Sequence, residues 1–218
     1  MKPSSSKDGT QSGRVRKAWR LPLLLVQFLR SEARSYELDL THLVIRVFSA
    51  LRTHYDVGGP QAALLERDRR ALRMQRWEYL AHGLYSRVQL ITDRGAGSDG
   101  PATVASRRAA EPKRVRIERF ESGTKVLQNW FLPPELLVDL REEAERLGWT
   151  QTAMAVALLN MYAGFYPLPA AGAAELERER LMIGLGRWEY FQHIWWRRAE
   201  RVAAEQAGFD RPGSKDPR

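Results

Sequence analysis

Cysteine is absent from the 218 residues of this chain. Its absence excludes a disulfide framework, a cysteine-ligated zinc or iron–sulfur site and a thiol nucleophile. Long apolar runs are also absent; the run Leu21–Val26, for example, ends at Gln27 and is too short to span a membrane. Both absences lead us to expect a cytoplasmic protein without a membrane anchor.

The sequence also offers little that predicts an enzyme. It has no catalytic triad, phosphate-binding loop or acidic pair in a suitable context, so we expect no catalytic residue and no cofactor. Glu78 and His82, like Glu189 and His193, are four residues apart, which places each pair on one helix face. One carboxylate and one imidazole are too few ligands for a metal ion, so we interpret each pair as a structural hydrogen bond and expect no metal site.

Basic residues outnumber acidic ones, with 35 lysines and arginines against 26 aspartates and glutamates, and the net charge is +9. The excess is uneven. Residues 1–20 contain six basic residues and one acidic residue, whereas residues 119–207 carry a net negative charge. This balance favours a polyanionic partner that meets the N-terminal end of the chain.

Two parts of the chain resemble each other when Trp19 is aligned with Trp130. In this repeat alignment Leu21 falls on Leu132, and the motif Arg-Trp-Glu-Tyr at 76–79 falls on the same motif at 187–190. Between residues 19–87 and 130–198, 22 of 69 aligned positions are identical without a gap. Chance gives only a few identities over that length, so we interpret the chain as an internal duplication.

The second copy predicts a strand followed by two helices. Residues 124–132 contain apolar β-forming side chains between a glycine and a proline, and Pro133 suits the first turn of a helix. Apolar residues then recur every three or four positions until Gly148, which we expect to end that helix in a left-handed conformation. Thr150 and Thr152 are candidate N-caps of the next, apolar helix, and Thr152 lies nearer to the apolar run.

This order of strand, proline, amphipathic helix, Gly-x-Thr-x-Thr turn and apolar helix resembles the ribbon-helix-helix family of DNA-binding proteins. The matching residues are Leu132, Pro133, Leu136, Leu140, Ala144, Leu147, Gly148, Thr150, Thr152, Met154 and Leu158. The first copy matches over residues 14–55, where Glu37 and Asp39 replace the glycine and the first threonine, and Thr41 is kept.

The resemblance implies that two such units interlock, with their strands paired antiparallel in a ribbon that enters the major groove of DNA. It also implies that the second helices point their N-termini, near Thr41 and Thr152, at flanking phosphates. Because one chain holds both units, the expected fold is mainly α with a short antiparallel β-ribbon, a tandem ribbon-helix-helix pseudo-dimer. We expect the units at 14–91 and 114–207, a linker at 92–113, and disordered tails at 1–13 and 208–218.

Side chains alternate across a β-ribbon, and this alternation assigns the two faces of each strand. The tryptophans and leucines next to the helix prolines should face the core. The opposite face then carries the candidate DNA-binding residues, which are Arg14, Arg16, Ala18, Arg20, Lys125, Leu127, Asn129 and Phe131. Arginine can donate two hydrogen bonds to guanine and asparagine can pair with adenine, so we expect unequal half-sites and a non-palindromic DNA site. A second interpretation makes the strand of the second copy purely structural.

Each copy continues into a segment with helical periodicity. We expect one extra long helix over about 60–88 and another over about 171–202. These helices either pack on the core or form a surface for higher oligomers or a protein partner. The candidate residues of that surface are Trp188, Trp195 and Trp196. Between the copies, Arg114–Phe120 alternates like a strand and either extends the ribbon or forms a charged end of the linker.

Taken together, these features predict a sequence-specific double-stranded DNA-binding protein of a prokaryote or its mobile elements. It would act as a transcriptional repressor or a DNA-organising protein associated with the nucleoid, with no membrane partner. The alternative is a protein-interaction module, such as an antitoxin or assembly adaptor, that uses the tryptophan-rich helices. Salt distinguishes the two, because phosphate contacts weaken steeply as the salt concentration rises.

Overall fold

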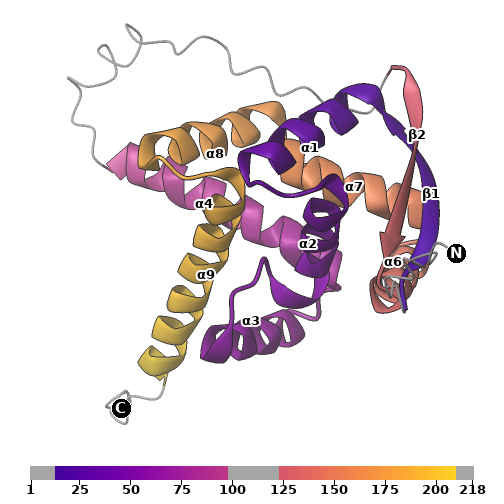
Figure 1. Cartoon of the computed structure of the whole chain (residues 1–218). Coiled ribbons are helices and arrows are strands. Elements are labelled where there is room, and N and C mark those ends of the chain that lie inside the picture. The colour runs from indigo at the N-terminus through magenta and orange to yellow at the C-terminus, as the bar shows by residue number, and fades with distance from the viewer. Residues whose placement is uncertain (1–12, 98–122, 210–218) are drawn as a thin grey trace, which may run out of the picture.

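The described residues of the chain fold into helices and a two-stranded antiparallel sheet (Figure 1). The computed structural model describes residues 13–97 and 123–209. The first stretch contains β1 (Val15–Pro22), α1 (Leu23–Ser35), α2 (Leu40–Thr53), α3 (Gly59–Ala71) and α4 (Arg76–Gly97). The second contains β2 (Lys125–Leu132), α6 (Pro134–Arg146), α7 (Gln151–Gly164), α8 (Ala170–Ile183) and α9 (Arg187–Phe209). The predicted order of a strand and two helices is thus confirmed in both stretches.

Two sequence predictions fall wholly or mostly outside these residues. The strand proposed at Arg114–Phe120 lies outside the described residues, as do most residues of both tails and of the linker. Both units extend further than expected: α4 continues past residue 91 to Gly97, and α9 continues past residue 207 to Phe209. Among the described helices, none is long and apolar enough to cross a membrane.

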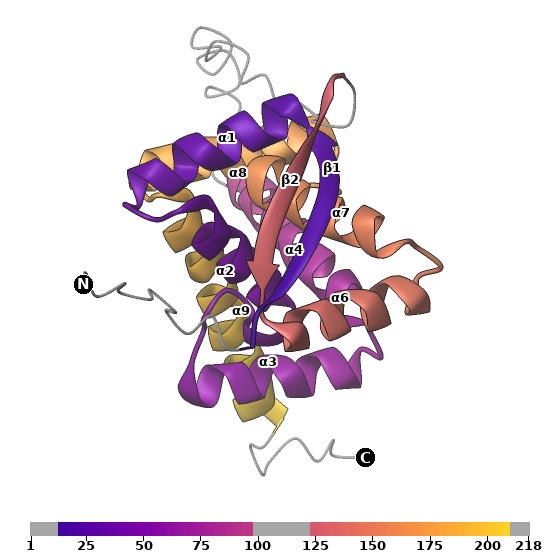
Figure 2. The same ribbon diagram turned by 45° about the vertical axis from the view of Figure 1, so that its right-hand side comes forward.

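The sheet joins two segments that are far apart in the sequence. β1 pairs with β2 along its whole length, and Ala18 lies opposite Asn129, its equivalent in the repeat alignment (Figure 2). On the inner face Trp19 and Trp130 are buried, with their ring centroids 5.7 Å apart in an edge-to-face contact. These large apolar side chains anchor the ribbon on the helices behind it.

A proline ends each strand and starts the following helix. Pro22 and Pro133 both have φ −54° and ψ 133°, which turns the extended chain directly into α1 and α6. The helix after Pro133 ends at Arg146, and Gly148 follows with φ +67°, the left-handed conformation that the sequence predicts. α1, α2, α6 and α7 then enclose the core beneath the ribbon (Figure 2).

The prediction of one long helix in each copy is wrong, because each segment is broken into two helices. The first break lies between α3 and α4, where Arg73 has φ +55°, and the second lies between α8 and α9, where Gly184 has φ +69°. An arginine side chain closes each turn. Arg69 donates to the carbonyl of Met74 at 2.7 Å, and Arg180 donates to the carbonyl of Leu185 at 2.8 Å. Across the second break Leu181, Leu185 and Trp188 keep a heptad-like spacing, which conceals that break in the sequence.

The breaks let the helices of the two stretches exchange partners. α3 packs against α9, and α4 packs against α8 (Figure 1). Two mostly buried ion pairs join the same partner helices. Arg198 of α9 donates to Asp68 of α3 at 2.6 Å, and Arg87 of α4 donates through Nε to Glu179 of α8 at 2.9 Å. The repeat alignment places Arg87 on Arg198 and Asp68 on Glu179, so the two contacts are reciprocal.

Candidate nucleic-acid interface

The outer face of the ribbon carries the side chains that the strand alternation assigns to it. Arg16, Ala18 and Arg20 of β1 are exposed, and so are alternate residues of β2. The exposed residues of β2 are Lys125, Leu127, Asn129 and Phe131. The described helices lie behind the ribbon, on its inner side (Figure 2). The predicted division into a buried and an exposed face is therefore confirmed.

The antiparallel register distributes these side chains along the ribbon. Arg16 lies opposite Phe131 at one end, Arg20 lies opposite Leu127 at the other, and Ala18 faces Asn129 at the centre. Exposed Arg14 precedes the first end. At the second end Lys125 lies opposite the proline that closes β1. Both ends of the outer face therefore combine an arginine, a second cation and an apolar side chain.

Two side chains of β2 accept hydrogen bonds from arginines, one of which lies on β1 and the other on α1. Arg16 donates to the side-chain oxygen of Asn129 at 3.2 Å, across the two strands. Arg30 of α1 donates to the side-chain oxygen of Gln128 at 3.4 Å. Sequence reasoning missed Arg30, because helical periodicity alone does not show that α1 runs beside β2. Its exposed guanidinium adds a further cation to the edge of the ribbon.

The N-termini of α2 and α7 differ in charge. Asp39 caps α2 by accepting from the amide of His42 at 3.0 Å, and Thr150 caps α7 by accepting from the amide of Ala153 at 3.1 Å. Of the two candidate caps, Thr150 is thus the N-cap and Thr152 is not, since Thr152, like Thr41, is the second residue of its helix. Thr150 lies directly before the first helical residue, Gln151, where its hydroxyl can accept from an amide of the first turn that has no partner within the helix.

The carboxylate of Asp39 stays ionised at the start of α2. Its partial burial opposes ionisation, but hydrogen bonds from the backbone amides of His42 and Thr41 outweigh that effect and lower its pKa. The imidazole of His42 also contacts this carboxylate. A fixed negative charge already satisfies the helix dipole there, so the N-terminus of α7 is better suited than that of α2 to accept a phosphate.

The tryptophan surface predicted on the last helix does not exist as expected. Trp188 and Trp195 are buried, and of the three candidates only Trp196 is exposed, at 45%. Trp195 packs on Gly83 of α4, where any Cβ atom would collide with the indole ring. Because Gly83 has no side chain, the indole ring of Trp195 fits against α4 and is buried there. The residue pattern of α9 alone does not predict this burial.

The two glutamate–histidine pairs do not make the hydrogen bonds predicted for them. Glu78 accepts from the backbone amide of Gln75 at 2.9 Å and so caps its own helix. Glu189 accepts from the hydroxyl of Tyr36 at 2.8 Å and so joins α9 to the end of α1. The described part of the chain contains no group of three or more acidic or histidine side chains that could hold a metal ion.

The exposed ribbon is the feature from which a function can be inferred. Its outer face combines cations, a carboxamide and two apolar groups on a surface two strands wide. Comparison with models of protein families, with curated proteins and with solved structures finds no match to the chain.

Proposed function

We propose that the protein binds double-stranded DNA sequence-specifically by inserting the β1–β2 ribbon into the major groove. The observation that carries this proposal is the exposed outer face with Arg16, Arg20 and Asn129 on a ribbon whose inner face is buried. Paired strands lie about 5 Å apart, and the major groove of B-DNA is about 12 Å wide, so a ribbon fits into it. In this role the protein acts as a transcriptional repressor or a DNA-organising protein of the nucleoid.

We also propose that the fold is a tandem ribbon-helix-helix pseudo-dimer that arose by duplication. The order of one strand and four helices occurs in both described stretches, which supports two related units. The ribbon pairs Ala18 with its equivalent Asn129, as a two-fold axis at the centre of the ribbon requires. The reciprocal ion pairs of Arg87 and Arg198 fit the same axis.

Each exposed side chain then has a chemical role in DNA recognition. Arg16 and Arg20 donate to O6 and N7 of guanine, and Asn129 pairs with adenine. Leu127 and Phe131 meet thymine methyl groups by apolar contact. The remaining cations near the ribbon neutralise phosphates, and the N-terminus of α7 adds its backbone amides. The phosphate-binding cations are Arg14, Arg30 and Lys125.

The proposal is tested with a double substitution on the ribbon, Arg16→Ala with Arg20→Ala. Preferred duplexes are first selected from a random-sequence pool with the full-length protein, and their affinity is then measured by fluorescence anisotropy over a range of salt concentrations. Two bidentate contacts of about 1–3 kcal/mol each correspond to a loss of about 30-fold or more. The affinity of the unsubstituted protein should fall steeply as salt rises.

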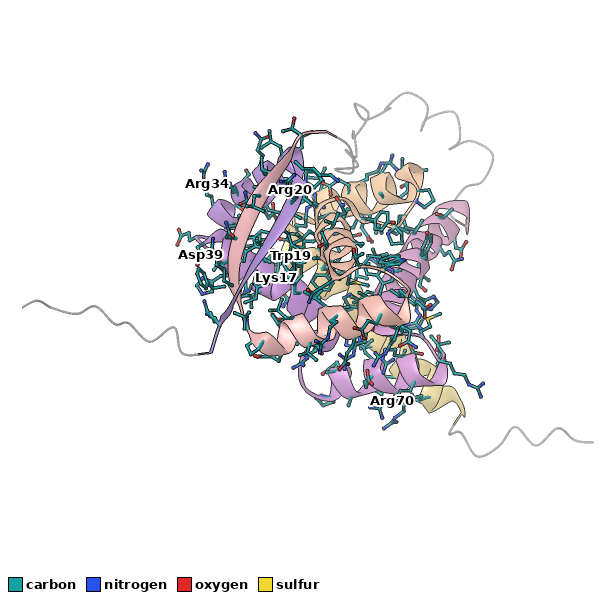
Figure 3. All side chains as sticks on the ribbon, turned by 90° about the vertical axis from the view of Figure 1, so that its right-hand side faces the viewer. Lys17, Trp19, Arg20, Arg34, Asp39 and Arg70 are labelled. Atoms are coloured by element: carbon teal, nitrogen blue, oxygen red, sulfur yellow. The ribbon has the colours of Figure 1, made fainter. Side chains whose placement is uncertain are left out.

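The matched control is Arg67→Ala with Arg70→Ala, which removes the same charge from exposed positions of α3. Arg70, near the C-terminal end of α3, lies far from the ribbon in Figure 3, and Arg67 lies one turn earlier on the same helix. The control should change the affinity less than threefold, and thermal unfolding should show that both double variants are folded. Equal losses in the two variants, or retention of affinity without the ribbon arginines, contradict the proposal.

An interaction module is the second candidate, because three consecutive apolar side chains are exposed at the end of α8. They are Leu181, Met182 and Ile183, and Met182 is 79% exposed. An exposed cluster of this kind is typical of a contact with another protein. If the protein associates through it, sedimentation should show a concentration-dependent mass that Met182→Lys abolishes. A constant monomer mass excludes self-association through this cluster.

A further inference from the structure

Within the paired strands, both arginines of the outer face lie on β1. Arg16 is near one end of β1 and Arg20 is near the other. The positions that the repeat alignment assigns to them on β2 hold Leu127 and Phe131. A ribbon whose side chains followed the symmetry of its backbone would carry arginines at equivalent positions of both strands. The ribbon therefore has a nearly symmetric backbone but an asymmetric set of exposed side chains.

The ribbon is narrower than the major groove of DNA, and its width determines which DNA strand each β-strand approaches. Two paired strands about 5 Å apart in a groove about 12 Å wide each lie nearer to one wall. The side chains of β1 therefore approach the base edges of one DNA strand, and those of β2 approach the other. Four residues of extended chain separate Arg16 from Arg20 by about 13 Å, which spans about three to four base-pair steps.

The centre of the ribbon is asymmetric as well. Asn129 of β2 faces Ala18 of β1, so only one strand presents a polar group there. The bond from Arg16 to the carboxamide of Asn129, at 3.2 Å, links this group to one end of the ribbon. The oxygen of the carboxamide keeps a second lone pair and its amino group stays a donor, so it can still bind adenine.

We propose that the protein reads a directional DNA site, with two guanines on the same DNA strand about three to four base pairs apart. This inference rests on the proposed DNA binding and states which duplexes are bound. Arg16 and Arg20 of β1 read the two guanines. Leu127, Asn129 and Phe131 of β2 face the complementary strand, where they favour thymine methyl groups and an adenine. An inverted repeat places one guanine on each strand and fits this surface less well.

The test is the cross-strand exchange Arg16→Phe with Phe131→Arg. These two residues face each other in the ribbon, so the exchange preserves composition and net charge. It leaves arginines at 20 and 131, which are equivalent in the repeat alignment and lie on different strands. The unsubstituted protein should select duplexes of the form G-N(2–3)-G, and the exchanged protein should select an inverted repeat, either G-N(2–3)-C or C-N(2–3)-G.

Selection from a random duplex pool is followed by anisotropy titrations of both proteins against both duplexes. One bidentate arginine–guanine contact of about 1–3 kcal/mol predicts that each protein prefers its own duplex by about fivefold or more. If both proteins prefer same-strand guanines, or if either selects sites without a guanine pair, the directional site is overturned although DNA binding stands. If no duplex binds at low salt, the proposed function itself fails.

Single variants keep the inference testable if the exchanged ribbon does not fold. Arg16→Gln and Arg20→Gln change exposed side chains only. Each should relax the base preference at one guanine of the selected site, and the two relaxed positions should lie on one DNA strand. Relaxed positions on opposite strands, or one position relaxed by both variants, overturn the directional site.

Discussion

The two described stretches, 13–97 and 123–209, agree on the inner face of the ribbon and differ on its outer face. Trp19 and Trp130 occupy equivalent places on the inner face. On the outer face, each arginine of β1 corresponds to an apolar residue of β2 in the repeat alignment. Packing restricts which side chains fit a shared core, whereas an exposed strand face accepts almost any residue. The comparison shows that the exposed side chains of the ribbon can change independently of the scaffold that holds them.

The same comparison identifies a difference at the end of the second helix. His54 follows α2 and Phe165 follows α7, and both adopt the left-handed conformation, with φ +47° and +56°. Both side chains are buried, but only the imidazole can take up a proton. One stretch therefore contains a titratable group where the other contains a hydrocarbon ring.

The reciprocal ion pairs should show the largest effect on stability. Arg87→Met and Arg198→Met each leave a mostly buried carboxylate, Glu179 or Asp68, without its cation. Removing one partner of such a pair costs about 3 kcal/mol of unfolding free energy. Urea unfolding of both variants measures these losses.

Because the two pairs are reciprocal, the two losses should be similar. Arg67→Met, at an exposed position of α3, serves as the control and should change the unfolding free energy by less than about 0.5 kcal/mol. A large loss in one variant and none in the other would break the equivalence of the two stretches.

The difference between His54 and Phe165 should appear as a difference in pH dependence. Burial lowers the pKa of His54 from 6.5 to about 4, with nearby Arg69 and Arg76 adding to the shift and Glu66 opposing it. Below pH 6.5 the unfolded chain binds a proton that the folded chain does not bind until about pH 4. This group should therefore cost about 3 kcal/mol of stability as the pH falls from 7 to 4.

His54→Phe makes the two stretches alike at this position and should remove that part of the pH dependence. Urea unfolding at pH 7, 5.5 and 4 compares the two proteins, and the contributions of the carboxyl groups cancel in the difference. Parallel pH profiles of the variant and the unsubstituted protein would mean that His54 does not stay neutral in the fold.

The smallest expected effect concerns the helix caps. Asp39→Asn keeps the cap of α2 but removes its charge, and Thr150→Asp adds a charge to the cap of α7. Charges at helix N-termini are worth about 0.3–1 kcal/mol, so DNA affinity should rise about two- to fivefold in the first variant and fall by the same factor in the second. Anisotropy at low salt measures both, and changes in the same direction would contradict the phosphate contact.

The faces of the ribbon could be predicted from the sequence because they depend on local alternation. Trp19 and Leu21, repeated as Trp130 and Leu132, identify the inner face, and the prolines that follow fix where each strand ends. Strand periodicity needs no knowledge of distant contacts. The role of these side chains toward DNA stays a prediction until binding is measured.

Features that depend on contacts between the two stretches could not be predicted. Trp195 is buried because Gly83, which belongs to the other stretch, leaves space for its ring. The turn at Arg73 is closed by a bond from Arg69 to a backbone carbonyl, in a segment without glycine. Side-chain spacing along one helix is the same for an exposed and a buried tryptophan, and only the partner helix decides between them.

Because β1 and β2 belong to one polypeptide, their pairing is independent of protein concentration. A ribbon assembled from separate subunits comes apart on dilution, whereas this one keeps its shape even in a single molecule. A single substitution also alters only one of the two strands, while in a homodimer it would alter both. Joining the strands in one molecule thus makes it possible to change one end of the ribbon and leave the other end as it was.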